Sequence, residues 1–418
     1  MSEHRDKSAD TAKRGIELQP MPLPYRALGT LFSTFGAHPY SMEPERIKAA
    51  AARDAGLPAR FSDAVEEGLA RACRALRDEA NLHWFGRANL WELMVTGLSA
   101  KLRVDDLYRR HPELDETPLR PPLIVVGLPR SGTTFLHRLL ADTDDARAIR
   151  FYEHLRPLPP DGPDVRRLRA EVKFAPWRRL GAQYNLDAIH YVRPGEADEC
   201  HFSLRLCMHS TIYWSMAPTH SYLEWLLQQD AREAYQTYRR VLLCMQRENP
   251  SGRMTLKCPS HLAFLPTLTE VVPEAMLVQI HRAPESIAAS EASLMLALHA
   301  TSVRELDWRR SVQSNLGKIT TYANRSADFA DTEVGQRVKH VDYRRLTSEP
   351  VAVAREIREH FGLAYGPDHE RRLQRYAHQN RQHKRGRHRY SAEQYEFDPD
   401  AIAPRFARYR ARFAEWLS

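Results

Sequence analysis

The segment GLPRSGTT, Gly127 to Thr134, constrains the fold more than any other part of the chain. It follows a short β-branched run, LIVVG, at Leu123 to Gly127, and it leads into TTFLHRLLADT, where Phe135, Leu139 and Leu140 have helical spacing. We therefore predict a strand, a tight glycine-containing loop and a helix, in that order. Such a loop points several backbone N–H groups and the positive end of the helix dipole at one place, which suits a phosphate group.

The same loop departs from the phosphate loop of NTPases. Its two glycines have the expected separation, but Thr133 stands where those enzymes carry a lysine. The fixed cation is instead Arg130, and no predicted strand ends in an aspartate that would hold Mg²⁺. We expect no metal requirement. A degenerate kinase or NTPase stays an alternative, as does a tight turn that binds nothing.

Two further strand–helix units are predicted. MLVQIH at 276–281 and RVKHVDYRRL at 337–346 read as buried strands, and the helices after them begin near Pro284 and Pro350. Strands that alternate with helices indicate an α/β fold with a mainly parallel central sheet, covered on both faces in three layers. Residues 21–118 are expected to form an N-terminal helical region, residues 119–418 the α/β domain, and residues 1–20 a disordered tail.

Composition narrows the class of ligand. The chain has 61 Lys and Arg against 53 Asp and Glu, a net charge of +8 that is spread out, which favours a small polyanionic ligand over a nucleic acid. The five cysteines show no CxxC spacing, so neither a disulfide framework nor a zinc site is indicated and a cytoplasmic location fits best. No apolar run approaches the ~18 residues of a transmembrane helix.

A second anion site is indicated after the strand at 276–281. Arg282 follows this strand directly, and Ser290 lies about two turns into the next helix, on the same side of the sheet. Taken alone, a serine in an amphipathic helix is more often a surface or packing residue. Beside the first loop, the pair favours a ligand with two separate phosphate positions.

These motifs, in this order, resemble the sulfotransferase superfamily, whose members take a sulfuryl group from 3′-phosphoadenosine 5′-phosphosulfate (PAPS). The resemblance rests on PPLIVVGLPRSGTTFLHRLL and IHRAPESIAAS, with LKCPSHLAFLPTL between them, and extends more weakly from about Pro121 to the C-terminus. It is greatest to the broad bacterial-type branch. It implies a P-loop-like fold, PAPS as co-substrate, adenosine 3′,5′-bisphosphate (PAP) as product, and in-line transfer to a hydroxyl or amine. A nucleotide-binding relative without catalysis is the alternative.

The resemblance also assigns the donor site. The loop would hold the 5′-phosphosulfate, Phe135 would stack on adenine, and Arg282 with Ser290 would hold the 3′-phosphate. The basic stretch HKRGRHR would close over that phosphate through Arg385 and Gly386, although a solvated charged loop is the equal alternative. The predicted donor-binding residues are Arg130, Ser131, Gly132, Thr133, Thr134, Phe135, Arg282, Ser290, Arg385 and Gly386.

Catalysis needs a cation on the sulfuryl group and a base for the acceptor. Lys257 and Arg130 are the predicted cations, and His261 is the favoured base, with Glu199 or Glu196 as competitors. His190 and His201 are expected to be structural. The aromatic residues between about 174 and 238 would line a pocket for a small-molecule, lipid or sugar acceptor, or would simply be core. A homodimer is compatible with the sequence.

Overall fold

The computed structural model describes residues 15–25, 27, 40–380 and 391–417. These residues contain a five-stranded sheet of order β2-β3-β1-β4-β5 in which every neighbouring pair is parallel. The strands are β1 (Leu123–Gly127), β2 (Ala146–Ala148), β3 (Arg253–Lys257), β4 (Met276–His281) and β5 (Lys339–Asp342). The predicted α/β class with a parallel central sheet is confirmed.

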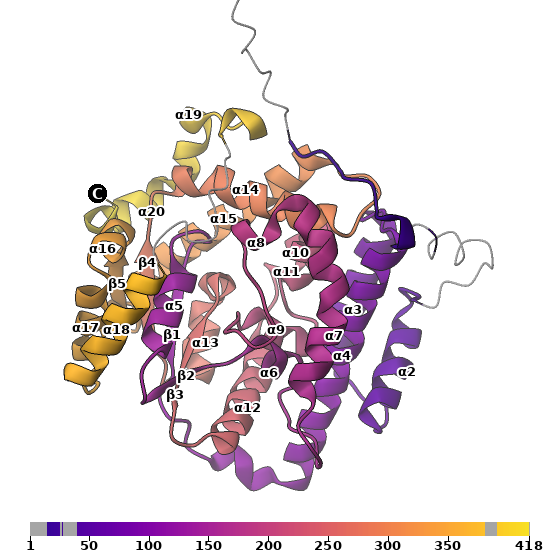
Figure 1. Ribbon diagram of the computed structural model, residues 1–418, viewed down its shortest axis with the longest axis horizontal. Coiled ribbons are helices and arrows are strands. Elements are labelled where there is room, and N and C mark those ends of the chain that lie inside the picture. Colours follow the sequence, from indigo (N-terminus) through magenta and orange to yellow (C-terminus); the bar gives the residue numbers. More distant parts are fainter. Residues whose placement is uncertain (1–14, 26, 28–39, 381–390, 418) are drawn as a thin grey trace, which may run out of the picture.

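Helices cover both faces of the sheet, as Figure 1 shows. Alternate residues of β1 divide between two hydrophobic clusters, because Leu123 and Val125 pack on one face while Ile124 and Val126 pack on the other. The first face is covered by α5 (Thr133–Ala141), α16 (Tyr343–Ser348), α17 (Pro350–His360) and α18 (Pro367–Gln379). The second is covered by α12 (Arg232–Glu248), α13 (Leu265–Val271), α14 (Pro284–Ala300) and α15 (Trp308–Ala330).

The N-terminal region is helical, as its spacing indicates. It comprises α2 (Pro44–Ala55), α3 (Asp63–Asp78) and α4 (Trp84–Arg110), and α3 begins where the Ser62 side chain accepts a hydrogen bond from the Val65 N–H. The buried side chains of these helices belong to the same cluster as the second face of the sheet. The helical layer therefore shares one core with the α/β part of the chain.

The remaining named α-helices lie in the chain between β2 and β3 or after β5. They are α6 (Phe151–Leu155), α7 (Arg166–Gly181), α8 (Leu186–Ile189), α9 (His201–Leu204), α10 (Ile212–Met216), α11 (His220–Leu226), α19 (Pro399–Ile402) and α20 (Ala407–Arg412). In the described part of the chain, no helix combines the length and apolar character needed to cross a bilayer. All five cysteines are buried and unpaired.

Several predicted boundaries were wrong. The strand expected at 337–346 stops at Asp342, because the Asp342 side chain accepts a hydrogen bond from the Arg344 N–H and starts α16. Strands β2 and β3 were missed. Of the tail expected at 1–20, the described residues 15–20 are held in place: the Gly15 N–H donates to the Gln394 carbonyl at 2.9 Å, and Gln394 donates back to the Gly15 carbonyl at 3.0 Å.

Candidate functional site

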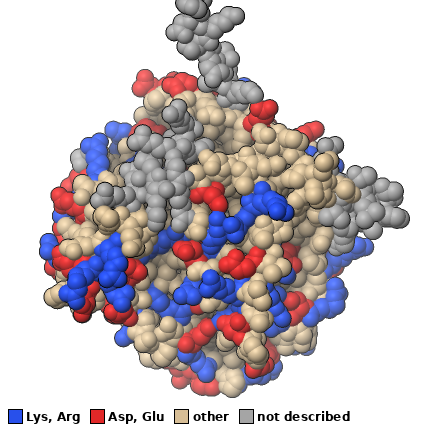
Figure 2. All heavy atoms as spheres, in the orientation of Figure 1, with Lys and Arg blue, Asp and Glu red and all other residues tan. Residues whose placement is uncertain are grey.

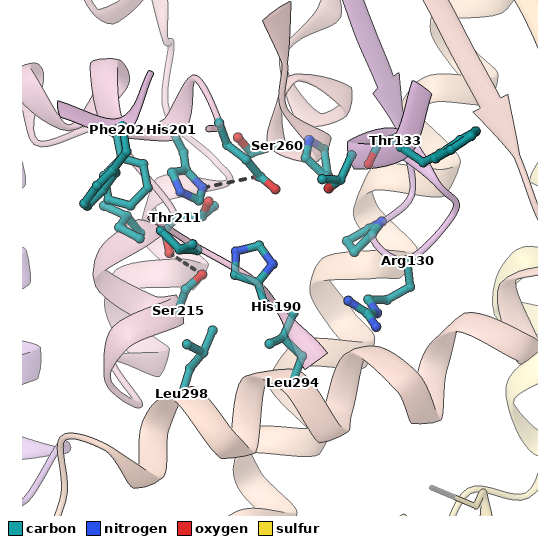
Figure 3. Close-up of a pocket in the computed structure, with 18 of the residues that line it drawn as sticks. Arg130, Thr133, His190, His201, Phe202, Thr211, Ser215, Ser260, Leu294 and Leu298 are labelled. Atoms are coloured by element: carbon teal, nitrogen blue, oxygen red, sulfur yellow. Dashed lines mark hydrogen bonds and ion pairs between the residues drawn. The ribbon is translucent and has the colours of Figure 1, made fainter. Parts of the chain in front are cut away.

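A cavity of about 1270 Å³ lies at the carboxyl ends of the central strands. Its lining includes the loop after β1, the residues after β4 and the start of α16, and it continues between α4, α7, α10 and α14. In parallel α/β sheets, ligands bind at this edge, where the loops leave the strands. The cavity therefore joins a polar end next to the sheet to a largely apolar end among the helices (Figure 3).

The loop after β1 is shaped to bring backbone close to a ligand. A Cβ at Gly127 would lie 2.8 Å from the Ile280 carbonyl oxygen, and Gly132 has a φ of 90°. Arg130 also adopts a positive φ, of 65°, although it is not glycine. Gly132 stands at the start of α5 and has no side chain that could cap the helix. The first N–H groups of α5 therefore have no capping partner, and they face the cavity.

The predicted anion-binding residues contact one another. Arg130 donates from Nε to the Ser290 hydroxyl at 3.2 Å, and Arg282 donates from Nη1 to the Arg130 carbonyl at 2.7 Å. The Arg282 guanidinium lies 4.4 Å from the ring centre of Tyr343. Together with Gly132, Thr133, Thr134 and Phe135, these residues line the cavity. The structure thus brings the two predicted phosphate elements into one cluster.

The other residues predicted to bind the sulfuryl donor differ in their position relative to the cavity. Ser131 is buried beneath the loop, outside the cavity lining, and within the described residues its hydroxyl finds no hydrogen-bond partner. Phe135 lines the cavity and lies 6.1 Å from Tyr376, measured between ring centres. Arg385 and Gly386 fall outside the described residues.

Glu199 lines the cavity and forms a buried ion pair with Lys257, which lies behind the lining residues. Lys257 ends β3 with a side chain only 2% exposed, and it donates from Nζ to Glu199 Oε1. The backbone holds the two residues together, since the Cys200 N–H donates to the Lys257 carbonyl at 3.1 Å. Burial works to raise the pKa of Glu199, but Lys257, then His201 and His190, outweigh it and lower that pKa to about 2. Glu199 is therefore ionised at neutral pH.

Two histidines that the sequence indicated as structural also line the cavity. His201 Nδ1 lies 3.6 Å from Glu199 Oε2, and His190 projects into the middle of the cavity between His201 and Arg130 (Figure 3). Burial lowers the pKa of His201 to about 4 and that of His190 to about 3, so both imidazoles are neutral at pH 7. Histidine spacing gave no signal for this role, because His190 follows the end of α8 and His201 begins α9, with an irregular segment between them.

His261 does not line the cavity. It is fully buried behind the wall, where its Nδ1 lies 2.8 Å from the Tyr235 hydroxyl and its ring packs between Tyr235 and Tyr238. Its neighbour Ser260 is the residue that reaches the cavity. Glu196 is exposed and is likewise absent from the lining. The favoured role of His261 as the base is therefore not supported by the geometry, whereas Glu199 is well placed for it.

The far end of the cavity is largely apolar. Aromatic side chains from α6, α7 and α9 pack there, with ring centres 4.8 Å apart in the Phe151–Phe202 and Phe174–Trp177 pairs. Leu294 and Leu298 of α14 complete this wall (Figure 3). Charged residues interrupt it: Lys318 donates to the buried Glu291 at 3.0 Å, and the lining also includes Glu92, Arg166, Arg169 and Lys173. Part of the aromatic segment expected to hold the acceptor thus faces a cavity rather than only core.

One group of described side chains could hold a cation. Glu199, His201 and Cys258 offer ligand atoms within 4.8 Å of one another. The Lys257 ammonium is already paired with the Glu199 carboxylate. Burial raises the pKa of the Cys258 thiol well above its usual range, so this thiol is protonated at neutral pH. Lys257 therefore supplies one positive charge at this position.

Known proteins are similar to this chain in sequence and in architecture. A sequence profile described as "Sulfotransferase family" matches residues 121–367, a span that contains all five strands. The omega-hydroxy-beta-dihydromenaquinone-9 sulfotransferases Stf3 of Mycobacterium bovis and Mycobacterium tuberculosis are each 26% identical to this chain over 287 residues, which cover 66% of this chain and 71% of each relative.

Solved structures agree with this match. Sulfotransferase STF1 from Mycobacterium tuberculosis superposes with a TM-score of 0.68 at 26% identity, over 87% of this chain and 98% of its own. Sulfotransferase STF9 from Mycobacterium avium gives a TM-score of 0.75 at 24% identity, over 88% of this chain and 96% of its own, which supports the fold.

Proposed function

This chain belongs to the sulfotransferase family, and from that premise we propose that it transfers a sulfuryl group from PAPS to a hydroxyl or amine of a lipid-like acceptor. One observation carries the proposal: Arg130, Ser290 and Arg282 form a contiguous cluster beside the uncapped start of α5, next to a cavity whose other end is apolar. The lipid character of the acceptor draws on the relatives named as menaquinone sulfotransferases.

The donor site suits a ligand with two separated anionic groups. The uncapped N–H groups of α5 and Arg130 would hold the 5′-phosphate, with Thr133 and Thr134 as further donors. Arg282 and Ser290 would hold the 3′-phosphate, and Phe135 would stack on the adenine. When bound, PAPS supplies an activated sulfuryl group, and the chain's residues position and neutralise it without a metal.

Lys257 and Glu199 would act as a linked pair in the transfer. In the ion pair, Lys257 is the strongest influence that lowers the pKa of Glu199. If the ammonium turns to a sulfuryl oxygen, that influence weakens and the effect of burial raises the pKa of Glu199. The carboxylate would thus become a better base as the lysine engages the donor, and it would then accept the proton of the acceptor hydroxyl.

Two features support a lipid-like acceptor and a cytoplasmic location. The apolar end of the cavity is walled by Phe151, Phe174, Trp177 and Phe202, which suits a hydrocarbon or quinone-type group.

The five cysteines are unpaired, which suits a reducing compartment.

Binding of PAP tests the proposal. Isothermal titration calorimetry should show micromolar-range binding of PAP that is unchanged by EDTA. Arg130→Ala should weaken PAP binding by more than about tenfold, roughly 1.4 kcal/mol. Arg337→Ala is the matched control, since it removes an arginine that is 71% exposed and paired only at the surface with Glu333. Preferred, magnesium-dependent binding of ATP would instead support the kinase or NTPase alternative.

A further inference from the structure

The outer face of α7 carries aliphatic side chains that no described residue covers. Among the described large hydrophobic residues, Leu168 is 64% exposed and Val172 is 66% exposed. They are four residues apart, so they lie on one face of the helix, and exposed Ala175 and Arg179 continue the same line. An α-helix of 16 residues is about 24 Å long, so this line forms an extended strip rather than a single exposed side chain.

Basic side chains flank this strip. Arg167, Arg169, Lys173, Arg178 and Arg179 all belong to α7, whereas Glu171 is the acidic residue inside that run. Lys173 pairs with Glu92 of α4, but within the described chain no carboxylate lies in ion-pair distance of the four arginines. Figure 2 shows Lys and Arg side chains gathered over the middle of the face on which α7 lies in Figure 1, with acidic side chains among them.

The inner face of the same helix forms part of the cavity wall. Ala170, Phe174 and Trp177 line the apolar end, and Arg169 and Lys173 also belong to the lining. At this side, α7 therefore separates the cavity from solvent. Its apolar side faces inward and its aliphatic strip faces outward.

A neighbouring segment extends the exposed apolar surface. The Tyr25 hydroxyl donates to the Pro176 carbonyl at 3.3 Å, and the Gln19 N–H donates to the Tyr184 hydroxyl at 3.0 Å, so residues 19–25 lie against the C-terminal end of α7. Leu23 in this segment is 76% exposed. Three of the four exposed large hydrophobic side chains described thus belong to α7 or to the segment beside it; the fourth is Val334.

We propose that the outer face of α7, defined by Leu168, Val172, Ala175 and Arg179, docks on an anionic lipid surface, so that a lipid-like acceptor enters the cavity directly behind the helix. Aliphatic side chains flanked by arginines are the pattern of helices that lie in the headgroup region of a bilayer. A second copy of the chain is a poorer occupant. A two-fold contact through this face would oppose the same unpaired arginines on both copies. The membrane source of the acceptor rests on the proposed function, whereas binding to lipid does not.

Vesicle flotation with the full chain tests the docking surface. The chain should float with vesicles of phosphatidylcholine and phosphatidylglycerol, bind phosphatidylcholine alone much less, and dissociate in about 0.5 M NaCl, where charges are screened within a few ångströms. Leu168→Asp with Val172→Asp should lower partitioning at least about tenfold. Arg179→Glu should lower it at least about fivefold, since each basic residue near an anionic surface contributes about that factor.

Val334→Asp is the matched control, because Val334 is also an exposed aliphatic residue, 42% exposed, and it lies outside α7. It should leave partitioning within about twofold. PAP affinity should stay within about twofold in every variant, which shows that each one folds. The docking proposal is overturned if the wild-type chain binds PAP but does not float, or if Val334→Asp lowers flotation as much as the α7 variants do.

Sedimentation tests whether a second copy of the chain, rather than a lipid surface, covers the outer face of α7. If the wild-type chain sediments as a dimer that the Leu168→Asp, Val172→Asp variant dissociates, and no vesicles are bound, the face is a contact between copies and the lipid proposal is wrong. If wild-type chain floats but binds no PAP, the docking surface stands and the proposed function fails instead.

Discussion

Glu199→Gln is the substitution that best tests the linked pair in the cavity wall. The amide keeps the shape of the side chain but carries no charge and accepts no proton at neutral pH. It therefore removes the proposed base, and it leaves the Lys257 ammonium, which is 2% exposed, without its ion-pair partner. Both catalysis and stability should respond.

The size of the stability effect follows from the pKa of Glu199. That pKa falls from 4.5 to about 2 on folding, which corresponds to about 3 kcal/mol of the free energy of unfolding. A buried ion pair that loses one partner costs about 3–5 kcal/mol, which is the same range. Because the folded-state pKa is the lower one, this contribution is complete above pH 4.5 and is lost as the pH falls toward 2. The difference between wild type and variant should therefore be the same at pH 7.5 and pH 8.5, above the pKa of about 6 to which burial raises the neighbouring Asp198.

Urea unfolding and initial rates measure the two effects separately. The variant should lose about 3 kcal/mol of stability and about 10²- to 10⁴-fold in turnover, while PAP affinity changes by less than about threefold. Glu196→Gln is the matched control, since Glu196 precedes Glu199 by three residues, is exposed and does not line the cavity. It should change stability by less than about 0.5 kcal/mol. If Glu199→Gln keeps full turnover, or if Glu196→Gln loses it, the assignment of the base is wrong.

Three other substitutions test separate parts of the site and fold. Gly132→Ala should weaken PAP binding by more than about tenfold and lower the free energy of unfolding by about 1–3 kcal/mol. The reason is that Gly132 has a φ of 90° and that a Cβ there would lie 3.2 Å from Tyr343. Calorimetry measures the binding and urea unfolding measures the stability. Lys318→Met should cost about 3–5 kcal/mol by leaving Glu291 buried and unpaired, and adding Glu291→Gln should restore much of it in thermal unfolding. Burial lowers the pKa of His340 from 6.5 to about 4, so wild-type stability should fall as the pH drops through that range, and His340→Phe should flatten the dependence in urea unfolding at each pH.

The sequence predicted the centre of the fold well because strong local signals mark it. Strands β1 and β4 are continuous apolar runs, and their predicted ends, Gly127 and His281, are the observed ones. Each is followed by a residue pattern that starts a helix, so the two anion-binding elements could be placed on the same edge of a parallel sheet. The contact between Arg130 and Ser290 confirms that they meet.

The missed elements lack such signals. Strand β3 has the sequence RMTLK, in which a threonine and a terminal lysine interrupt the apolar pattern, although four of its five residues are buried. Strand β2 is three residues long and only half-buried. The pairing of Glu199 with Lys257 spans 58 positions and depends on where the chain returns to β3. Local periodicity holds no information on such a contact, and for the same reason it could not show that His261 lies behind the wall.

The sheet order explains how this loop manages without the lysine of an NTPase. Strands β3, β1 and β4 are adjacent, and neighbouring strands lie about 4.8 Å apart. Lys257 ends β3, Arg130 follows β1 and Arg282 follows β4, so three cations lie side by side along the carboxyl edge. A lysine in the loop concentrates positive charge on one polyphosphate chain. Charge divided over three strands instead suits a ligand with more than one anionic group, and under the proposed function Lys257, which is paired with Glu199, would serve the group that is transferred.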